Sequence, residues 1–409
     1  MATIRILKAV DAGKLLTRRA ARMTEAEETV RPILEAVRKR GDAAVIEYAR
    51  KFDGFSGKSL RITPTEDGVS PKFKNAVRTA ARNIRQFAKL QLPKPASKLL
   101  APGLKVGQIV RPIPAMGAYI PAGRYPLPST LLMTVIPAQV AGVPEICVTT
   151  PKPVPEILAT AAMLDVRNVF QIGGAHAIAA FAYGTRTVPK VDRIVGPGNI
   201  YVAAAKKMLA GEVGIDFVAG PTEILIIAAE GNPRWIAADM LAQAEHDTDA
   251  SAILLTTSKA LAAAVEAELD WQLTSLPTAP TAKAALKKNS AILIVDSLEQ
   301  ACEISNEFAP EHLSLHHPEL LPQIENAGGI FLGSISPEAA GDYAAGPNHV
   351  LPTSGAARLR GGLSSADFVK VIATQELSRK ALGKLAPSIT TLARAEGLEA
   401  HARSIEVRQ

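Results

Sequence analysis

The fold is decided by residues 115–150, AMGAYIPAGRYPLPSTLLMTVIPAQVAGVPEICVTT. Short β-rich runs stand at its two ends, Gly117–Ile120 and Ile146–Thr150, and a helical pattern of apolar residues lies between them, Thr130–Ala141. A strand, a helix and a second strand in this order form a βαβ unit, in which the two strands run parallel. The stretch therefore predicts an α/β fold.

The same alternation continues along the chain in two series. The first series adds a helix and two strands at Ile157–Leu164, Val169–Ile172 and Arg193–Val195. The second series supplies four further strand candidates, separated by helical stretches: Ile224–Ala228, Ile253–Thr256, Ile292–Val295 and Ile330–Leu332. Aromatic residues make up only 4% of the chain, so the cores must consist of aliphatic side chains, which suits parallel sheets covered by helices. We expect two Rossmann-like parallel-sheet domains.

The segments outside these two series predict helices and connections. Glu25–Arg40 and Lys72–Leu90 have a helical spacing of apolar residues, and a connector rich in Pro and Gly follows within 92–103. Ser275–Lys288 is rich in Pro, Thr, Ala and Lys, which indicates a surface connection. We expect a helical N-terminal arm and, from about residue 363, a helical C-terminal tail.

Composition narrows the class of protein. Apolar residues make up 47% and charged residues 21%, as in soluble globular proteins. The net charge of +7 would suit a nucleic-acid binder, but basic and acidic residues alternate along most of the chain, so we expect no nucleic-acid partner and favour an enzyme for anionic dinucleotides. Cys147 and Cys302 form no CxxC pair and are interpreted as small buried residues. No apolar run reaches membrane-spanning length and no signal peptide is evident, so we expect a cytoplasmic protein without membrane contact.

Four polar clusters in the second half of the chain indicate an enzyme. They contain four of the seven histidines and are Gln243-Ala244-Glu245-His246, Glu311-His312, Asp342 with His349, and Glu396 with His401. Imidazole, carboxylate and amide oxygen together make a plausible zinc shell. An adjacent Glu-His pair offers two proton acceptors at one place.

Each cluster also has a simpler reading. Asn232-Pro233 begins a helix on which Gln243 and His246 share a face, where they could ligate a metal or could be surface residues at the helix end. Glu311-His312 follows Pro310 and could be catalytic or part of an exposed turn.

The third cluster lies in a glycine-rich segment, Gly341–His349, whose length favours a functional loop. Asp342 could bind a metal or a cationic substrate, whereas His349 could simply hydrogen-bond the loop backbone. His316-His317, by contrast, is interpreted as surface.

Three glycine-bearing turns belong to the first series: Pro121-Ala122-Gly123, Gly173-Gly174-Ala175-His176 and Gly196-Pro197-Gly198-Asn199. Such turns let a pyrophosphate approach backbone N–H groups. No complete GxGxxG is present, so each turn could also be an ordinary connection between a strand and a helix.

Taken together, these segments resemble the histidinol dehydrogenase family, from about Val30 to the C-terminus. Five stretches in one order carry the resemblance: Val195–Asn199, Ala219–Glu223, Gln243–His246, Ala309–Leu313 and Gly346–Thr353. The resemblance implies a zinc- and NAD-dependent oxidation of L-histidinol to L-histidine through histidinal, the last step of histidine biosynthesis. It also implies an intertwined homodimer with one Zn²⁺ per subunit, in which the C-terminal segment completes the partner's site.

The resemblance assigns roles to individual residues. It implies that His312 is the base of the alcohol step and that Glu311 activates water for the aldehyde step. The zinc ligands would be Gln243, His246, Asp342 and, from the other subunit, His401. The substrate would contact these ligands and His312, together with Thr222, Ser129 and, from the other subunit, Glu396. NAD would contact Tyr119, His176 and Asn199, although the family commonly has Gln where His176 stands and Ser where Thr222 stands.

The resulting division of the chain has four parts. Residues 1–20 form the arm, and residues 21–118 with 224–362 form a discontinuous α/β domain with the zinc and catalytic residues. Residues 119–223 form an inserted NAD-binding domain, and residues 363–409 form the tail that reaches the partner. Two alternatives remain open at this point: a related zinc- and NAD-dependent dehydrogenase acting on another polar alcohol, and a zinc hydrolase that uses Glu311 without a dinucleotide.

Overall fold

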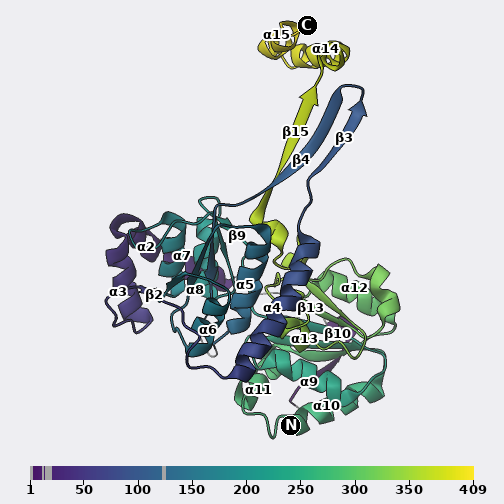
Figure 1. Cartoon of the computed structure of the whole chain (residues 1–409). Helices are drawn as coiled ribbons and strands as arrows, with labels where there is room; N and C mark the ends of the chain where they lie inside the picture. The colour runs from purple at the N-terminus through teal and green to yellow at the C-terminus, as the bar shows by residue number, and fades with distance from the viewer. Residues whose placement is uncertain (1–2, 12, 14–20, 122–125) are drawn as a thin grey trace.

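A computed structural model of the chain describes residues 3–11, 13, 21–121 and 126–409. Two six-stranded sheets with their helices form the body, and a narrow antiparallel arm projects from it with two helices at its tip (Figure 1). The predicted α/β class with two mainly parallel sheets is confirmed. Part of the predicted turn at Pro121-Ala122-Gly123, and half of residues 1–20, lie outside the described residues.

The first sheet contains the stretch that predicted the fold. Its strand order is β2 (Arg61–Ile62), β7 (Asn168–Phe170), β6 (Glu145–Thr149), β5 (Ala115–Tyr119), β8 (Arg193–Val195) and β9 (Gly214–Ile215). All neighbours run parallel except β2 and β7. The connecting helices are α5 (Pro128–Ala141), α6 (Pro155–Met163), α7 (Gly174–Tyr183) and α8 (Ile200–Leu209). β5 is buried along its whole length, as expected for a central strand covered on both faces.

The second sheet is parallel throughout. Its strand order is β1 (Arg5–Lys8), β12 (Ala291–Ile294), β11 (Ser251–Thr256), β10 (Glu223–Ile227), β13 (His312–Leu315) and β14 (Gly329–Leu332). Its helices are α9 (Pro233–Ala244), α10 (Lys259–Gln272), α11 (Ala279–Asn289), α12 (Leu298–Phe308) and α13 (Glu338–Tyr343). Asn232 caps α9 as predicted, because its side chain accepts a hydrogen bond from the backbone N–H of Arg234.

The N-terminal segments pack differently from the predicted division. Helices α2 (Ala21–Arg40) and α3 (Asp42–Phe52) pack on α7 and α8, and α4 (Pro71–Gln91) packs on α5, so all three belong with the first sheet and not the second. Residues 5–8, assigned to a helical arm, form an edge strand of the second sheet. Apolar spacing shows which face of a helix is buried but not which partner covers it, and that explains the error.

The projecting antiparallel arm consists of segments for which no strands were predicted. β3 (Ala96–Ala101) lies within the expected connector and forms a hairpin with β4 (Leu104–Pro112), which follows it. β15 (Val369–Leu377) pairs antiparallel with β4. The tail is therefore not helical from residue 363: it begins with a strand and becomes helical in α14 (Arg379–Ala395) and α15 (Glu399–Glu406). These two helices lie at the far end of the arm, well away from the body (Figure 1).

Two further findings concern the surface. The segment predicted as a surface connection contains α11, whose Pro280 lies at the start of the helix, where its missing N–H is not needed. Among the described helices, none is both long and apolar enough to cross a membrane.

Candidate active site

The predicted zinc and base residues gather at the amino-terminal edge of the second sheet. β10 and β13 are parallel neighbours with Ile224 opposite His312, so Thr222 and Glu223 lie beside Glu311. Helix α9 ends at this edge and contacts α13, which supplies Asp342. Four segments far apart in the sequence therefore meet at one place.

Glu311 is held firmly by the start of β10. Its Oε2 accepts hydrogen bonds from Thr222 Oγ1 at 2.6 Å and from the Glu223 backbone N–H at 2.9 Å. Burial raises the pKa of Glu311 to about 8, although these two hydrogen bonds oppose the shift. In the metal-free chain the group therefore keeps its proton near neutral pH, so the exposed-turn reading of Glu311-His312 does not hold.

His312 is oriented as a proton acceptor. Its Nδ1 lies 3.0 Å from the backbone oxygen of Glu223, which can only accept, so Nδ1 carries the proton. Nε2 then has a free lone pair; it is buried, has no hydrogen-bond partner among the described residues, and lies 3.8 Å from Asp342 Oδ1. The ring stacks on Phe331 at a centroid distance of 5.9 Å, which fixes its plane.

Glu338 is a site residue that the sequence analysis missed. It lies on α13, one helical turn before Asp342, and is only 3% exposed. Its Oε1 lies 3.4 Å from His312 Nδ1. When the Gln243 amide is oriented with its nitrogen toward Glu338, that nitrogen donates a hydrogen bond to Oε2 of Glu338 at 3.0 Å. Burial raises the pKa of Glu338 to about 8. The spacing of four residues before Asp342 was the available signal.

The residues predicted to bind zinc are only partly together in one chain. Gln243 is fully buried in the last turn of α9. Because α9 ends at Ala244, His246 lies just beyond the helix, and the prediction that it shares a helical face with Gln243 is wrong. Its side chain is exposed, and desolvation by neighbouring protein atoms lowers its pKa. Asp342 opposes that lowering through its charge. The ligand atoms of His312, Glu338 and Asp342 all lie within 4.8 Å of one another, so this edge offers a group able to hold a metal ion. Nitrogen and oxygen donors of this kind fit zinc.

His401 and Glu396 lie far from this group. Glu396 caps the end of α14 and His401 belongs to α15, both at the tip of the arm (Figure 1). Both side chains are exposed. One chain therefore does not bring them to its own Asp342.

The first turn of α5 connects the two sheets at the site. His349 Nδ1 lies 2.8 Å from the backbone oxygen of Asp342, and its Nε2 lies 3.2 Å from Thr130 Oγ1. His349 therefore hydrogen-bonds the backbone of the Gly341–His349 segment, as one of its two readings predicted, although Asp342 lies on α13 and not in a loop. Ser129 precedes Thr130 and is 8% exposed, so α5 places it near this junction.

The predicted NAD residues lie at the carboxyl ends of the first sheet's strands, where dinucleotides bind in such folds. Asn199 caps α8, and its side chain accepts from the backbone N–H groups of Tyr201 and Val202, both at 3.1 Å. Tyr119 ends β5, and its hydroxyl accepts from Gly174 N–H at 3.1 Å.

His176 differs from the expectation of a dinucleotide contact. Its side chain is 1% exposed, and its Nε2 lies 2.8 Å from Asp53 Oδ2, which also accepts from Gly173 N–H at 2.8 Å. The ring is thus engaged inside the protein and supports the glycine turn from behind. Sequence spacing gave no hint of this, because Asp53 lies just after α3, far away in the chain.

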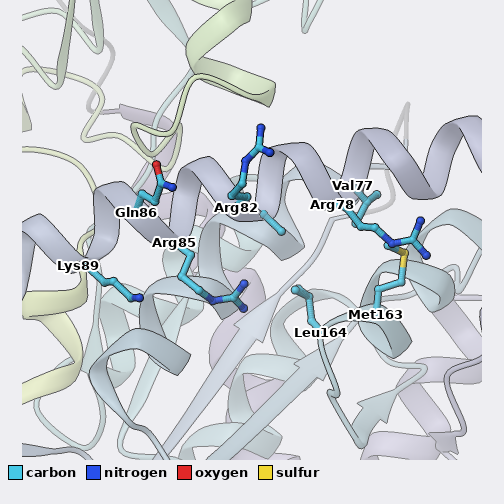
Figure 2. A pocket seen from close by; sticks show the side chains of 9 residues that line it. Val77, Arg78, Arg82, Arg85, Gln86, Lys89, Met163 and Leu164 are labelled. Atoms are coloured by element: carbon cyan, nitrogen blue, oxygen red, sulfur yellow. The ribbon is translucent and has the colours of Figure 1, made fainter.

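The described surface is hollowed beside Asp342 and along α4. A cavity of about 240 Å³ borders Asp342 and His349 and is lined on its other sides by β14 and α13. A larger one of about 360 Å³ lies along α4, where Arg78, Arg85 and Lys89 project beside Leu164 (Figure 2). The second hollow contains none of the predicted site residues, so the cavity beside Asp342 is the one that belongs to the candidate site.

The raised pKa of Glu311 predicts how the stability of the metal-free protein depends on pH. The folded protein holds this proton more tightly than the unfolded chain, so its stabilising effect is complete below the ordinary value of 4.5 and is lost as pH rises toward about 8. We expect the free energy of unfolding to fall in this window by up to about 1.4 kcal/mol per pH unit. Urea unfolding of the chelator-treated protein at several pH values measures the slope. In Glu311→Gln, which cannot ionise, the slope should be shallower; an unchanged slope would contradict the shift.

Comparison with known proteins gives matches to one family over nearly the whole chain. The sequence model of the histidinol dehydrogenase family matches residues 16–409. Histidinol dehydrogenase of Thermus thermophilus is 48% identical over 391 residues, covering 94% of each chain. That of Synechococcus sp. is 46% identical over 399 residues, covering 94% of this chain and 92% of the relative. A crystal structure of histidinol dehydrogenase from Elizabethkingia anophelis superposes with a TM-score of 0.95 at 37% identity, covering 100% of this chain and 98% of that chain.

Proposed function

The chain belongs to the histidinol dehydrogenase family, and we propose that it oxidises L-histidinol to L-histidine through histidinal, with NAD as hydride acceptor and one zinc ion per site. This is the last step of histidine biosynthesis. The family match over residues 16–409 and the relatives at 46–48% identity support the activity. We place the enzyme in the cytoplasm.

The orientation of His312 is the observation that carries the chemistry. Oxidation of an alcohol requires a base for the hydroxyl proton, placed within hydrogen-bond reach of it. Nε2 of His312 is buried, has no hydrogen-bond partner in the described part of the chain, and lies 3.8 Å from Asp342 Oδ1. Glu223 and Phe331 hold the ring in this position, so His312 serves as the base of the alcohol step.

The other site residues have different roles, which follow from the chemistry of their side chains. The zinc ligands would be Gln243, His246, Asp342 and His401 of the partner subunit, and the imidazole of the substrate would join them. NAD would accept the hydride. Glu311, once ionised, activates water for the aldehyde step. Asp342 and Glu396 of the partner subunit supply negative charge for the substrate's ammonium group, and Thr222 and Ser129 supply hydroxyl groups.

The arm supports a site shared between two chains. It carries Glu396 and His401 away from the body (Figure 1), and it exposes apolar side chains such as Leu99, Leu100 and Leu392, which are 65%, 58% and 65% exposed. Exposed apolar surface of this kind marks a contact with another protein. A second copy of the chain, with the two arms exchanged, would cover it and bring His401 to the partner's Asp342.

A direct assay tests the proposal. Purified zinc-loaded protein with L-histidinol and NAD should produce NADH, followed by its absorbance, and about two NADH per histidinol consumed because the oxidation removes four electrons in two hydride transfers. L-Histidinal should also be oxidised. Turnover of another polar alcohol but not of L-histidinol would favour a related dehydrogenase. Failure to bind NAD would favour a hydrolase.

Glu311→Gln is expected to slow oxidation of L-histidinal more than that of L-histidinol. The amide keeps the shape of the side chain but cannot take a proton from water, and a general base is typically worth about 10²–10⁴ in rate. Single-turnover measurements starting from each substrate give the two rates separately. Equal losses in both steps would show that the division of roles between Glu311 and His312 is wrong.

Mixing two inactive variants tests the shared site. If the arm crosses, a mixed dimer of His246→Ala and His401→Ala subunits carries both lesions in one site and leaves the other site intact. Co-expressed variants should therefore recover up to about half the activity per mixed dimer, which follows from one good site in two. The proportion of mixed dimer is checked with two different affinity tags. No recovery in verified mixed dimers would overturn the shared site.

A further inference from the structure

A buried ion pair lies behind the Gly196–Asn199 turn, outside the site described above. Lys206 on α8 is 1% exposed and Asp216, just after β9, is 6% exposed, and their charged groups are in direct contact. Taking two charges out of water is unfavourable, and apolar side chains of similar volume often stabilise a fold as well or better. A buried ion pair at this position is therefore expected to have a specific role other than stabilising the fold.

The pair holds both polar backbone groups of Gly196. Lys206 Nζ donates to the carbonyl oxygen of Gly196 at 3.0 Å, and Asp216 Oδ2 accepts from its N–H at 2.8 Å. The other oxygen of Asp216 accepts from Phe217 N–H at 2.7 Å, which fixes the carboxylate itself. Gly196 is thus clamped from two sides by side chains that are themselves fixed.

Gly196 needs this clamp because of its backbone conformation. Its φ is +110°, and a Cβ added there would lie 2.3 Å from the carbonyl oxygen of Tyr119. The residue follows the last residue of β8, so the strand ladder no longer sets its conformation. At the other end of the turn, Asn199 caps α8 through two backbone N–H groups. The turn is therefore held at both ends, by the ion pair and by the cap.

We propose that Lys206 and Asp216 are positioning residues that shape the Gly196–Asn199 turn to receive the phosphates of NAD. The turn lies at the carboxyl edge of a parallel sheet and at the start of α8, the place and the helix end that favour a dinucleotide. Both side chains are buried and neutralise each other, so they act through the shape of the turn and not by attracting the phosphates. The inference rests on the proposed function, which assigns NAD to this turn.

Two variants separate this role from general stability. Asp216→Asn keeps the size of the side chain, and the buried lysine can stay neutral by releasing its proton. Lys206→Met with Asp216→Asn removes both charges together, so neither is left uncompensated. Lys207→Met is the matched control, because Lys207 is the next residue of α8 but is exposed and pairs with Glu27 at 2.7 Å. Gly196→Ala is a reference for a turn that is forced to shift.

The measurements are made on the full-length, zinc-loaded protein. Calorimetry gives the Kd for NAD, thermal unfolding shows whether each variant is folded, and kinetics give KM for NAD and for L-histidinol. We expect the Kd and KM for NAD to rise about tenfold or more in both variants and in Gly196→Ala, since a displacement of about 1 Å can reduce a rate or an affinity on the order of 10²-fold. KM for L-histidinol and zinc content should stay unchanged, and Lys207→Met should match the wild type.

The outcomes distinguish this inference from the proposed function. Wild-type protein that does not bind NAD would reject the proposed function. Folded variants that bind NAD as tightly as the wild type would overturn the positioning role alone. Loss of the fold in both variants would also overturn it, because the pair would then maintain the whole domain and not the turn.

Discussion

His246→Ala is expected to lose zinc and, with it, almost all oxidation of L-histidinol, while the fold stays largely intact. The side chain lies at the end of α9 and is reached by solvent, so its removal opens no cavity in the core. The zinc site would lose one of its nitrogen ligands, while Asp342, which acts on His246 electrostatically, would remain. Metal analysis after gel filtration measures the zinc content, and circular dichroism checks the fold.

A matched control for this variant is His316→Ala. His316 follows β13 in the same domain but belongs to none of the groups that meet at the candidate metal site. It should retain zinc and activity. If His246→Ala kept a full complement of zinc and full turnover, the assignment of His246 as a ligand would be wrong.

His312→Ala is expected to reduce oxidation of both L-histidinol and L-histidinal by about 10²–10⁴, the usual contribution of a general base. The reason is the free lone pair on Nε2, which the hydrogen bond from Nδ1 to Glu223 fixes in place. Single-turnover rates at saturating NAD and substrate measure the loss without interference from binding.

His312→Asn tests which ring nitrogen matters. The asparagine amide can replace the Nδ1 donor toward Glu223 but offers nothing at the position of Nε2. It should therefore be about as inactive as His312→Ala while being more stable. Activity close to the wild type in His312→Asn would show that Nε2 is not the base.

Part of the candidate site could be predicted from residues that lie close together in the sequence. Gln243 lies in the last turn of α9 and His246 lies just beyond the end of that helix, so the two stay close because only two residues separate them in the chain. Glu311 and His312 are neighbours in the chain and so reach the same edge of the sheet. Both pairs could be predicted because their geometry is local.

The contacts between these pairs could not be predicted in the same way. Glu338 reaches Gln243 and His312 only because α13 crosses the edge where β10 and β13 begin. The proton on Nδ1 of His312 depends on the backbone oxygen of Glu223, a residue 89 positions earlier. His176 is withdrawn from the surface by Asp53, 123 positions away.

In the fold, the antiparallel arm formed by β3, β4 and β15 is the clearest example of a feature that sequence patterns could not predict. β15 is exposed along nearly its whole length, so it lacks the alternation of buried and exposed residues that identifies a strand. Its structure comes from pairing with β4, more than 250 positions earlier in the chain. Periodicity could not reveal it, because the partner and not the core defines the strand.

By itself the sequence determined the α/β class, most strands and helices of the body, and the residue types available for catalysis, because these depend on patterns within a few turns of chain. Only the tertiary structure decided which helices cover which sheet, that the tail begins as a strand of a projecting arm, and that His401 and Glu396 lie far from their own chain's Asp342. These features depend on contacts between distant segments, whose partners are selected by shape and burial across the whole molecule and not by local spacing.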